Sequence, residues 1–492
     1  MPRTIPELFD EAVAAAPDRV WLVAGDESFT YAEARARIGR AAAALRAAGL
    51  RPGDLVLATM CNTPDHLFTW LASAYAGTVL VTANPRSAEA ELTGLVGQVR
   101  PRLVVSDAPI AGAVAVERLF EEEAGFDGTG PAGPDDAAVL IPTSGTTGRS
   151  KLVTQTHRAY VMAGEGFPWW MELGPDDRLM TSLPLFHINA PAYSMLGSVA
   201  ARAGLALLPG FSASGFLDSA RKHGATEFNA IGAMLEILMR RPQRPDDADT
   251  PLRLCYTGPA PPKERHLEIE RRFGLRIVCG YAMSETPYGT IWPRGTRPFG
   301  TLGSIRQHPT LGVVNEGRVI RDGRPARPGE VGELELRNPA VMKGYWDMPD
   351  ETAKVLSDDG WLRTGDLVTD DGEGTYTFVG RVKEVIRRRG ENVAPAEIEE
   401  ALVDHPAVFE AAVVGVPSEL SEEDIKAFVV LHDPAADLAA VREHAAGRLA
   451  PFKVPRYMQA TAELPHTPTG RVAKHEISRE RTPDEIDFER RA

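Results

Sequence analysis

The sequence predicts an α/β protein. Over the first half of the chain, strands rich in valine, leucine and isoleucine alternate with amphipathic helices, which is the pattern of βαβ units in a parallel sheet. Short alternating strands follow from about residue 318, and a mixed α+β pattern follows from about residue 383. The chain has 492 residues. At roughly 150 residues per domain, we expect about three structural units.

Apolar spacing and turn residues place the elements of the first half. A helix is expected from Glu7 onward, and Thr30 opens a longer helix that ends near Gly49, before the Pro-Gly turn at 51–54. The same alternation then continues through strands at 55–60, 79–83, 103–106, 137–141, 152–154 and 179–183 and helices at 67–76, 87–96 and 157–171.

The strand at 137–141 leads into a loop rich in hydroxyl groups and glycine, residues 143–151. Gly145 and Gly148 permit a tight turn that brings backbone N–H groups close to an anion, while hydroxyls and Lys151 add donors. It is not a Walker loop, because no Gly-Lys-Ser/Thr sequence follows the glycines. The loop alone therefore favours a polyphosphate site, with a flexible surface turn as the alternative.

The second half changes character. Short strands at 318–320, 331–336 and 375–379, separated by Gly and Pro turns, predict a barrel-like β unit. A small C-terminal α+β domain of about 110 residues is plausible by size. Its expected elements are helices at 395–402 and 438–449 and strands at 411–416 and 427–431.

Composition excludes several classes of protein. The formal net charge of −14 argues against a nucleic-acid-binding protein or one that binds anionic membranes. Three widely spaced cysteines, which we expect to be buried, fit a reducing compartment and form no metal-binding cluster. The N-terminus lacks the apolar core of a signal peptide, and no apolar run approaches the ~20 residues that span a bilayer. We expect a cytoplasmic protein.

Further motifs occur in an order that resembles the adenylate-forming superfamily of acyl-CoA synthetases, peptide-synthetase adenylation domains and luciferases. The resemblance covers nearly the whole chain and is strongest to CoA ligases of the carnitine/crotonobetaine and aryl-acid types. The motifs that carry it are the loop 143–151, Leu183-Pro184-Leu185-Phe186-His187, Gly280-Tyr281-Ala282-Met283-Ser284-Glu285-Thr286, Trp361-Leu362-Arg363-Thr364-Gly365-Asp366, Gly380-Arg381-Val382-Lys383, Gly390-Glu391-Asn392-Val393 and Pro395-Ala396-Glu397-Ile398-Glu399.

The resemblance implies a domain organisation. Residues 1–382 would form an ATP- and acid-binding domain of two βαβ-type parallel sheets and a distorted β-barrel. Residues 383–492 would form a small mobile α+β domain that rotates about Lys383 between two reaction poses. The implied cofactors are ATP and Mg²⁺, with coenzyme A as the acceptor, and the implied partner is a small-molecule acid.

The resemblance also implies a role for each matching residue. Glu285 would hold Mg²⁺ between itself and ATP phosphates, Asp366 and Arg381 would bind the ribose, and His187 would gate the acyl pocket. In the nucleotide site, Lys151 and Thr146 would act on the phosphates, Thr286 would hydrogen-bond the α-phosphate, and Tyr281 would offer an aromatic face for the adenine. The remaining cofactor-binding candidates are Thr143, Ser144, Gly145, Thr147, Gly148 and Lys383. Candidates for the wall of the acid pocket are Asn189, Ser194, Asn229, Gly258, Gly280 and Met283.

One departure from the family pattern bears on catalysis. Where the family has a Pro-x-x-x-x-Gly-Lys pattern with a catalytic lysine, this chain has Pro465 to Gly470 followed by Arg471. A planar guanidinium differs from an ammonium in reach and geometry. Three interpretations follow: Arg471 acts more slowly in the same role, Lys474 supplies the ammonium, or the activated acid is unusual.

The expected reaction is adenylation of a carboxylic acid with release of pyrophosphate, followed by transfer of the acyl group to coenzyme A or to a carrier protein acting in trans. Two alternatives stay open at this point. In one, nitrite replaces the acid, and the activated product diazotises an aryl amine. In the other, the chain is a nucleotide-binding homologue that has lost catalysis, with Arg471 as the lesion. The oligomeric state and the identity of the acid are not predicted.

Overall fold

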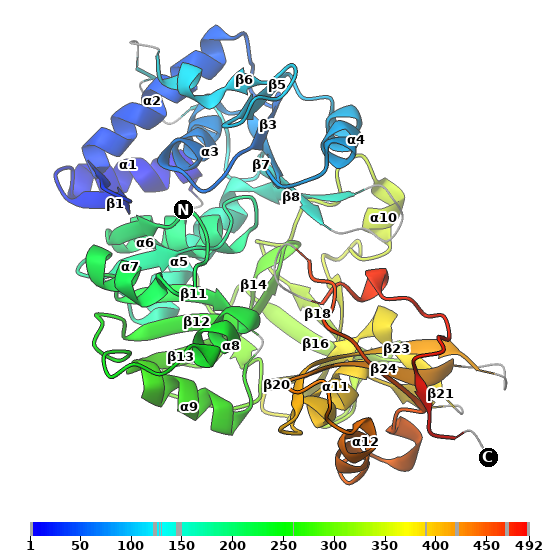
Figure 1. The fold of residues 1–492 in the computed structure, drawn as a ribbon. Coiled ribbons are helices and arrows are strands. Elements are labelled where there is room, and N and C mark those ends of the chain that lie inside the picture. Colours follow the sequence, from blue (N-terminus) through cyan, green and yellow to red (C-terminus); the bar gives the residue numbers. More distant parts are fainter. Residues whose placement is uncertain are drawn as a thin grey trace. The chain divides into compact units, whose positions relative to one another are not determined.

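The computed structural model describes residues 3–121, 125–126, 128, 130–143, 150–258, 260–388, 391–418, 423–467 and 472–489 (Figure 1). The chain forms two compact units. Unit 1 contains Met1–Gly317 and Leu336–Leu362, and unit 2 contains Arg318–Glu335 and Arg363–Ala492.

The first sheet of unit 1 has six strands in the order β6-β5-β3-β4-β7-β8. All pair in parallel except β8, which returns antiparallel to β7 at the edge. The expected parallel sheet and its short returning strand are therefore confirmed. The strands are β3 (Leu55–Thr59), β4 (Val79–Ala83), β5 (Leu103–Ser106), β6 (Val114–Ala115), β7 (Ala137–Thr143) and β8 (Lys151–Thr156).

The second sheet of unit 1 has nine strands in the order β15-β14-β13-β12-β11-β9-β10-β1-β2. Its central strands are parallel, and β2, β14 and β15 pair antiparallel at the two edges. The strands are β1 (Val20–Ala24), β2 (Glu27–Thr30), β9 (Arg178–Thr181), β10 (Gly204–Leu207), β11 (Glu227–Ile231), β12 (Leu254–Gly258), β13 (Arg276–Met283), β14 (Thr286–Ile291) and β15 (Ser304–Ile305).

Helices cover these sheets, and one hydrophobic core contains side chains from both, such as Val56 on β3 and Leu179 on β9. In Figure 1 the helices labelled α1 to α3 lie beside the first sheet, and α8 and α9 lie beside β12 and β13. The helical segments are α1 (Ile5–Ala15), α2 (Tyr31–Ala47), α3 (Pro64–Ala76), α4 (Glu89–Val99), η1 (Val116–Phe120), α5 (His157–Met171), the π-helix η2 (Ala190–Met195), α6 (Leu196–Ala201), α7 (Phe216–His223), α8 (Gly232–Arg240), α9 (Lys263–Phe273) and α10 (Pro349–Ala353).

Local chemistry explains where the predicted helices begin. Thr30 precedes α2, where its hydroxyl accepts the backbone N–H of Glu33 at 3.2 Å and its own N–H donates to the Glu33 carboxylate at 2.8 Å. This reciprocal pair satisfies two donors that the first helical turn leaves without partners. The helix predicted to open at Thr30 is therefore confirmed, and its start is fixed by residues next to it in the sequence.

Unit 2 contains most of a five-stranded sheet in the order β17-β16-β18-β19-β20, at the place of the predicted barrel-like unit. Thr364-Gly365-Asp366 lies inside β19, where Gly365 has a φ of 73°. The strands are β16 (Glu316–Arg321), β17 (Arg324–Pro325), β18 (Gly332–Arg337), β19 (Leu362–Asp370) and β20 (Tyr376–Arg381).

The rest of unit 2 is the α+β arrangement that the sequence predicts. A four-stranded sheet, β23-β24-β25-β26, shares a core with helices α11 and α12, and a small hairpin, β21-β22, precedes it. The elements are η3 (Val382–Glu384), β21 (Ile386–Arg388), β22 (Glu391–Val393), α11 (Pro395–Val403), β23 (Val408–Pro417), β24 (Glu423–Leu431), α12 (Leu438–Ala446), η4 (Pro451–Lys453), β25 (Tyr457–Ala460), η5 (Lys474–Glu476) and β26 (Ile486–Asp487).

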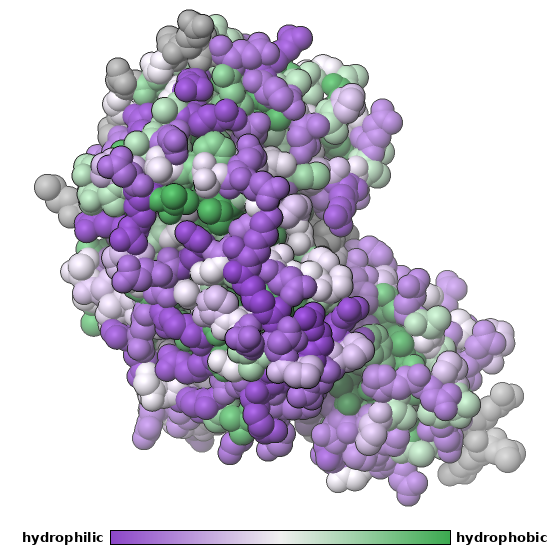
Figure 2. Space-filling model, turned by 60° about the vertical axis from the view of Figure 1, so that its left-hand side comes forward, coloured by the Kyte–Doolittle hydropathy of each residue, from purple (hydrophilic) through white to green (hydrophobic). Residues whose placement is uncertain are grey.

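The face in Figure 2 is mainly hydrophilic, with apolar residues in small patches. Within the described ranges, no helix is long and apolar enough to cross a membrane. Cys255 and Cys279 are buried as expected, but Cys61 is exposed, so the expectation that all three are buried is wrong. Cys61 follows the end of β3, where the chain leaves the sheet for a loop.

Candidate active site

Glu285, the predicted magnesium ligand, lies in the turn that joins β13 to β14 in unit 1. It is buried, and the hydroxyl of Tyr345 donates a hydrogen bond to its Oε1 at 2.9 Å. The turn is fixed on two further sides: the Met342 N–H donates to the Glu285 carbonyl at 2.8 Å, and the Gln155 amide donates to the Ser284 carbonyl at 2.7 Å. Residues distant in sequence therefore hold the carboxylate in one place.

Tyr345 is the donor in this pair. Burial raises the pKa of Tyr345, and the neighbouring Glu285 carboxylate raises it further. The phenol therefore stays protonated at neutral pH and continues to donate. The ring of Tyr345 has a second contact, because the Lys151 ammonium lies 4.8 Å from its centroid. Tyr345 thus links the predicted metal ligand to the predicted phosphate lysine.

Lys151 begins β8 and forms an ion pair with Glu351 on α10, with its Nζ 2.6 Å from Oε2. Hydrogen bonds from Lys151 and from Lys354 lower the pKa of Glu351 to about 2. At the other end of the phosphate loop, Thr143 pairs with Lys151 across β7 and β8, and its hydroxyl donates to the Lys151 carbonyl at 3.2 Å. The two ends of the loop are therefore joined. Predicted loop residues Ser144, Gly145, Thr146, Thr147 and Gly148 lie outside the described residues.

Thr286, expected to contact the α-phosphate, is fully buried, and its hydroxyl lies 3.3 Å from the Asn338 side-chain oxygen. Tyr281, the predicted adenine platform, is on β13, and its hydroxyl lies 3.6 Å from the sulfur of Met283. His187 packs against Phe186 with ring centroids 4.5 Å apart. Tyr281 and Thr286 therefore lie on either side of the β13–β14 turn, and His187 lies in the loop after β9.

The predicted acid-pocket residues also gather in unit 1. Asn229 on β11 donates from its amide to the Asn189 side-chain oxygen at 2.7 Å, just before η2. The side-chain oxygen of Asn229 is buried and has no hydrogen-bond partner among the described residues. The same holds for the hydroxyl of Ser194. A Cβ on Gly258 would come within 2.3 Å of the Gly280 carbonyl oxygen, so the close approach of β12 and β13 requires glycine there.

The predicted ribose-binding pair lies in unit 2. Asp366 on β19 faces Arg381 on β20, and the guanidinium Nε donates to the Asp366 carboxylate at 2.9 Å. Asp366 is 2% exposed, whereas the Arg381 side chain is 47% exposed. The hydroxyl of Thr364 accepts the Asp366 N–H at 3.1 Å and donates to the Leu334 carbonyl at 2.7 Å. The carboxylate is therefore fixed by its own strand and by an arginine that reaches solvent.

The C-terminal cations are described in part. Arg471 lies outside the described residues. Lys474 forms ion pairs with Glu384 at 3.1 Å and with Glu399 at 2.7 Å, all within unit 2. Burial raises the pKa of Glu399, while the charge of Lys474 opposes that rise. Two carboxylates thus hold the Lys474 ammonium, an arrangement typical of a structural contact. Lys383 lies in the short helix η3.

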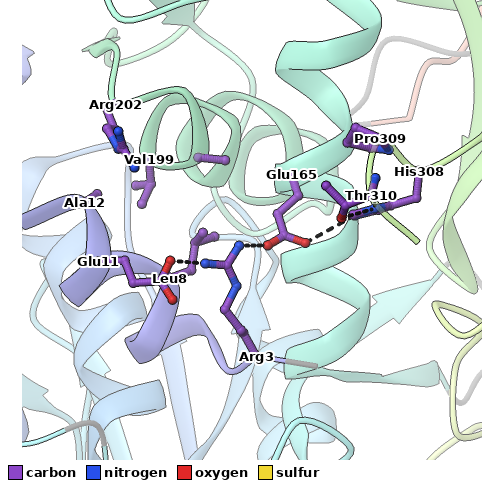
Figure 3. Close-up of a pocket in the computed structure, with 11 residues that line it drawn as sticks. Arg3, Leu8, Glu11, Ala12, Glu165, Val199, Arg202, His308, Pro309 and Thr310 are labelled. Carbon is purple, nitrogen blue, oxygen red and sulfur yellow. Dashed lines mark hydrogen bonds and ion pairs between the residues drawn. The ribbon is translucent and has the colours of Figure 1, made fainter. Parts of the chain in front are cut away.

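A separate pocket of about 230 Å³ opens in unit 1, and no predicted site residue lines it. Figure 3 shows Arg3 pointing between Glu11 and Glu165, with Glu165 turned toward His308. These contacts attach the N-terminal segment to α5. Sequence reasoning also missed Tyr345 and Glu351, which act through contacts with residues far from them along the chain.

Comparison with known proteins gives the family. The family model described as AMP-binding enzyme matches residues 9–346, and the model described as AMP-binding enzyme C-terminal domain matches residues 397–471. A sulfoacetate–CoA ligase of Cupriavidus necator is 34% identical over 96% of this chain and 98% of its own. A crotonobetaine/carnitine–CoA ligase of Salmonella typhimurium is 31% identical over 91% of this chain and 93% of its own.

Solved structures agree with this result. The ATP-bound MatB from Rhodopseudomonas palustris is 29% identical, with a TM-score of 0.85, over 95% of this chain and 97% of its own. The AMP complex of o-succinylbenzoate coenzyme A synthetase from Bacillus subtilis is 27% identical, with a TM-score of 0.85, over 96% of this chain and 98% of its own. The chain belongs to the AMP-binding family of adenylate-forming enzymes and is an ATP-dependent, AMP-forming acid–thiol ligase.

Proposed function

We propose that this enzyme activates a small-molecule carboxylic acid with ATP to give an acyl-adenylate and pyrophosphate, and then transfers the acyl group to the thiol of coenzyme A with release of AMP. The buried Glu285 carboxylate, held by Tyr345, is the observation that carries the proposal. The acid–CoA ligases named among the relatives support it and give no support to nitrite activation.

The residues fit a Mg²⁺ ion that is shared with substrate phosphates. Within the described part of the chain, no cluster of three or more His, Cys, Asp or Glu side chains could hold a metal by itself. Mg²⁺ commonly binds one or two protein carboxylates and completes its coordination with phosphate oxygens and water. Glu285 can supply such a carboxylate. When bound, the ion would neutralise charge that develops on the phosphates.

The remaining residues bind and orient the substrates in this proposal. Asp366 accepts hydrogen bonds from the ribose hydroxyls, and Arg381, which holds that carboxylate, reaches the same sugar. Lys151 exchanges its contact with Glu351 for the outer phosphates of ATP. Positioning of the acid against the α-phosphorus supplies much of the rate enhancement of the first step. In the second step, the mixed anhydride carries the driving force for transfer to the thiol.

The C-terminal part acts in both steps. We assign the cation next to the attacking carboxylate to Arg471, because Lys474 is already held by two carboxylates. Residues 383–492 would turn about Lys383 after adenylation, so that the thiol approaches the adenylate where the cation had been. Coenzyme A is the proposed acceptor, and a carrier protein acting in trans would use the same route. The proposed location is the cytoplasm.

A pyrophosphate-release assay over alkyl and aryl acids, with and without coenzyme A, tests the proposal. The expected result is acid-dependent release, with a thioester product only when coenzyme A is present. Release without any thioester product would refute the transfer step. Release that needs nitrite and an aryl amine would favour the diazotase alternative, and ATP binding without release for any acid would favour a homologue that has lost catalysis.

A further inference from the structure

Arg306 is a fully buried cation in unit 1, next to Gly280, one of the predicted acid-pocket residues. It directly follows β15, and its Nε donates to the Thr290 carbonyl at 2.9 Å. Its Nη1 donates to the Tyr193 hydroxyl at 2.8 Å and to the Pro287 carbonyl at 3.3 Å, and its Nη2 donates to the Tyr256 hydroxyl. The faces of Trp170, Tyr193 and Tyr256 lie 4.7, 5.1 and 5.4 Å from the guanidinium carbon.

None of the described acidic side chains pairs with this guanidinium, and the groups that interact with it electrostatically include the tyrosines Tyr193, Tyr256 and Tyr288. Other fully buried cations of the chain differ. Arg388 lies within 3.3 Å of Asp424 and 2.8 Å of Glu489, and Lys426 lies within 2.8 Å of Glu485. Buried charges are almost always paired, so a cation held only by neutral groups retains a field that an anionic ligand can use.

The position of Arg306 relates this field to the acid. A Cβ on Gly280 would lie 2.9 Å from Nη2 of Arg306 and 3.0 Å from the Tyr256 ring, so the guanidinium lies where a side chain at this position would point. Tyr256 is the cross-strand neighbour of Asn229, another predicted wall residue. The Pro287 carbonyl that binds Arg306 follows Thr286 in the chain. The cation therefore adjoins Gly280 and Tyr256, which belong to or neighbour the predicted wall residues.

We propose that Arg306 determines which acids the enzyme accepts: its charge favours acids with a second anionic group, a sulfonate or a carboxylate, next to the carboxylate that is activated. This inference rests on the proposed function and names its substrate class. Acids with a cationic substituent at the same place are disfavoured by the same field. Tyr193 and Tyr256 fix the guanidinium, and their hydroxyls neutralise none of its charge.

The size of the effect follows from Coulomb's law. Two unit charges about 7–10 Å apart, in a medium of effective dielectric constant about 20, change a binding constant on the order of 10- to 50-fold. Removing the charge of Arg306 should lower the preference for the doubly anionic acid by that factor. If Arg306 acted instead on the reactive carboxylate or on ATP, removing its charge would change kcat/KM by the same factor for all acids.

The test compares acids of matched shape in the pyrophosphate-release assay. Sulfoacetate, 3,3-dimethylbutanoate and glycine betaine carry anionic, neutral and cationic groups of similar tetrahedral shape, and malonate is compared with the neutral malonamate. Ratios of kcat/KM within each set are measured for the unchanged enzyme, Arg306→Met and Arg306→Gln. Such ratios do not depend on the fraction of active protein, and glutamine keeps an amide for the tyrosine hydroxyls if methionine prevents folding.

Two control variants separate charge from packing. Arg306→Lys keeps the charge and should keep the ratios. Asn315→Ser removes the amide donors to the carbonyls of Tyr288, Gly289 and Arg306, so it loosens the same segment without changing charge, and it should also keep the ratios.

The expected result is a preference for sulfoacetate, malonate or both in the unchanged enzyme that falls about 10- to 50-fold in both charge-free variants. The set that responds identifies the sulfonate or the carboxylate. Unchanged ratios in active Arg306→Met and Arg306→Gln proteins, or a preference for the neutral or cationic acid in the unchanged enzyme, would overturn this inference and leave the proposed function standing. Absence of release with every acid would overturn both.

Discussion

Tyr345→Phe tests whether the buried Glu285 is the metal-binding carboxylate. The substitution removes one hydroxyl, which donates to Glu285 at 2.9 Å, and keeps the ring that lies 4.8 Å from the Lys151 ammonium. The cation–π contact is therefore retained, and the change acts on the carboxylate alone.

The magnitude follows from the kind of hydrogen bond that is lost. A hydrogen bond to a charged group contributes about 1.5–3 kcal/mol. Partners that orient a metal ligand typically change metal affinity or activity by about 10- to 100-fold when removed. We expect kcat/KM for adenylation to fall by about that factor, with a higher Mg²⁺ concentration needed for half-maximal rate.

Pyrophosphate–ATP exchange measured across a range of Mg²⁺ concentrations provides the assay. Tyr288→Phe is the matched control, because the buried Tyr288 hydroxyl has no hydrogen-bond partner in the described part of the chain. It should leave the Mg²⁺ dependence unchanged. If Tyr345→Phe also has the Mg²⁺ dependence and rate of the unchanged enzyme, Glu285 is not the metal ligand, or Tyr345 does not position it.

Three further predictions concern charge. Glu351→Gln frees Lys151 from its ion pair and should lower KM for ATP about 2- to 5-fold, the modest size expected of a pair that solvent still reaches; an unchanged KM would count against the exchange of partners. Arg471→Lys should leave adenylation unchanged or raise it, and a large loss of exchange activity would show a role that lysine cannot fill. Burial raises the pKa of Glu227 well above its ordinary value, so the folded state holds a proton that the unfolded state releases, and stability falls as pH rises from the unfolded pKa toward the folded one. Glu227→Gln should therefore raise Tm more at pH 8 than at pH 5 in thermal unfolding, and a difference independent of pH would contradict this reasoning.

The sequence predicted those elements whose signals are local. Helix α5 spans the residues that the apolar spacing predicted, 157–171, because the side chain of Thr156 caps its start. Strand β4 spans the predicted 79–83, a fully buried apolar run. The β1–β2 hairpin was not predicted, and β19 passes through Thr364-Gly365-Asp366, where glycine and aspartate favour a turn. In both cases strand pairing overrides the local signal: β1 pairs with the distant β10 as well as with β2, and β19 pairs with β20.

The candidate site likewise contains some residues that have a local sequence signal and others that have none. Glu285 and Thr286 lie next to each other in one motif, and the family resemblance was sufficient to predict a role for each. Tyr345 follows Glu285 by 60 residues, and Tyr193 precedes Arg306 by 113. Such partners leave no periodic or local signal, because only the folded chain brings them together. In the sequence, Arg306 looks like an ordinary charged residue after a glycine-rich stretch. Only the structure shows that it is buried.

The cations that we propose to contact ATP share one property that Arg306 lacks within the described ranges, a carboxylate partner. Lys151, proposed for the phosphates, is paired with Glu351, and Arg381, proposed for the ribose, is paired with Asp366. An anion that recruits such a side chain must displace a carboxylate, so only the difference between the two interactions favours binding. This exchange suits residues that release product phosphates, since the internal carboxylate takes the cation back. Arg306 has neutral partners only among the described residues, and an anion near it gains the full remaining attraction. We therefore expect the buried, fixed Arg306 to discriminate between acids, and the paired Lys151 and Arg381 to take part in binding and release during turnover.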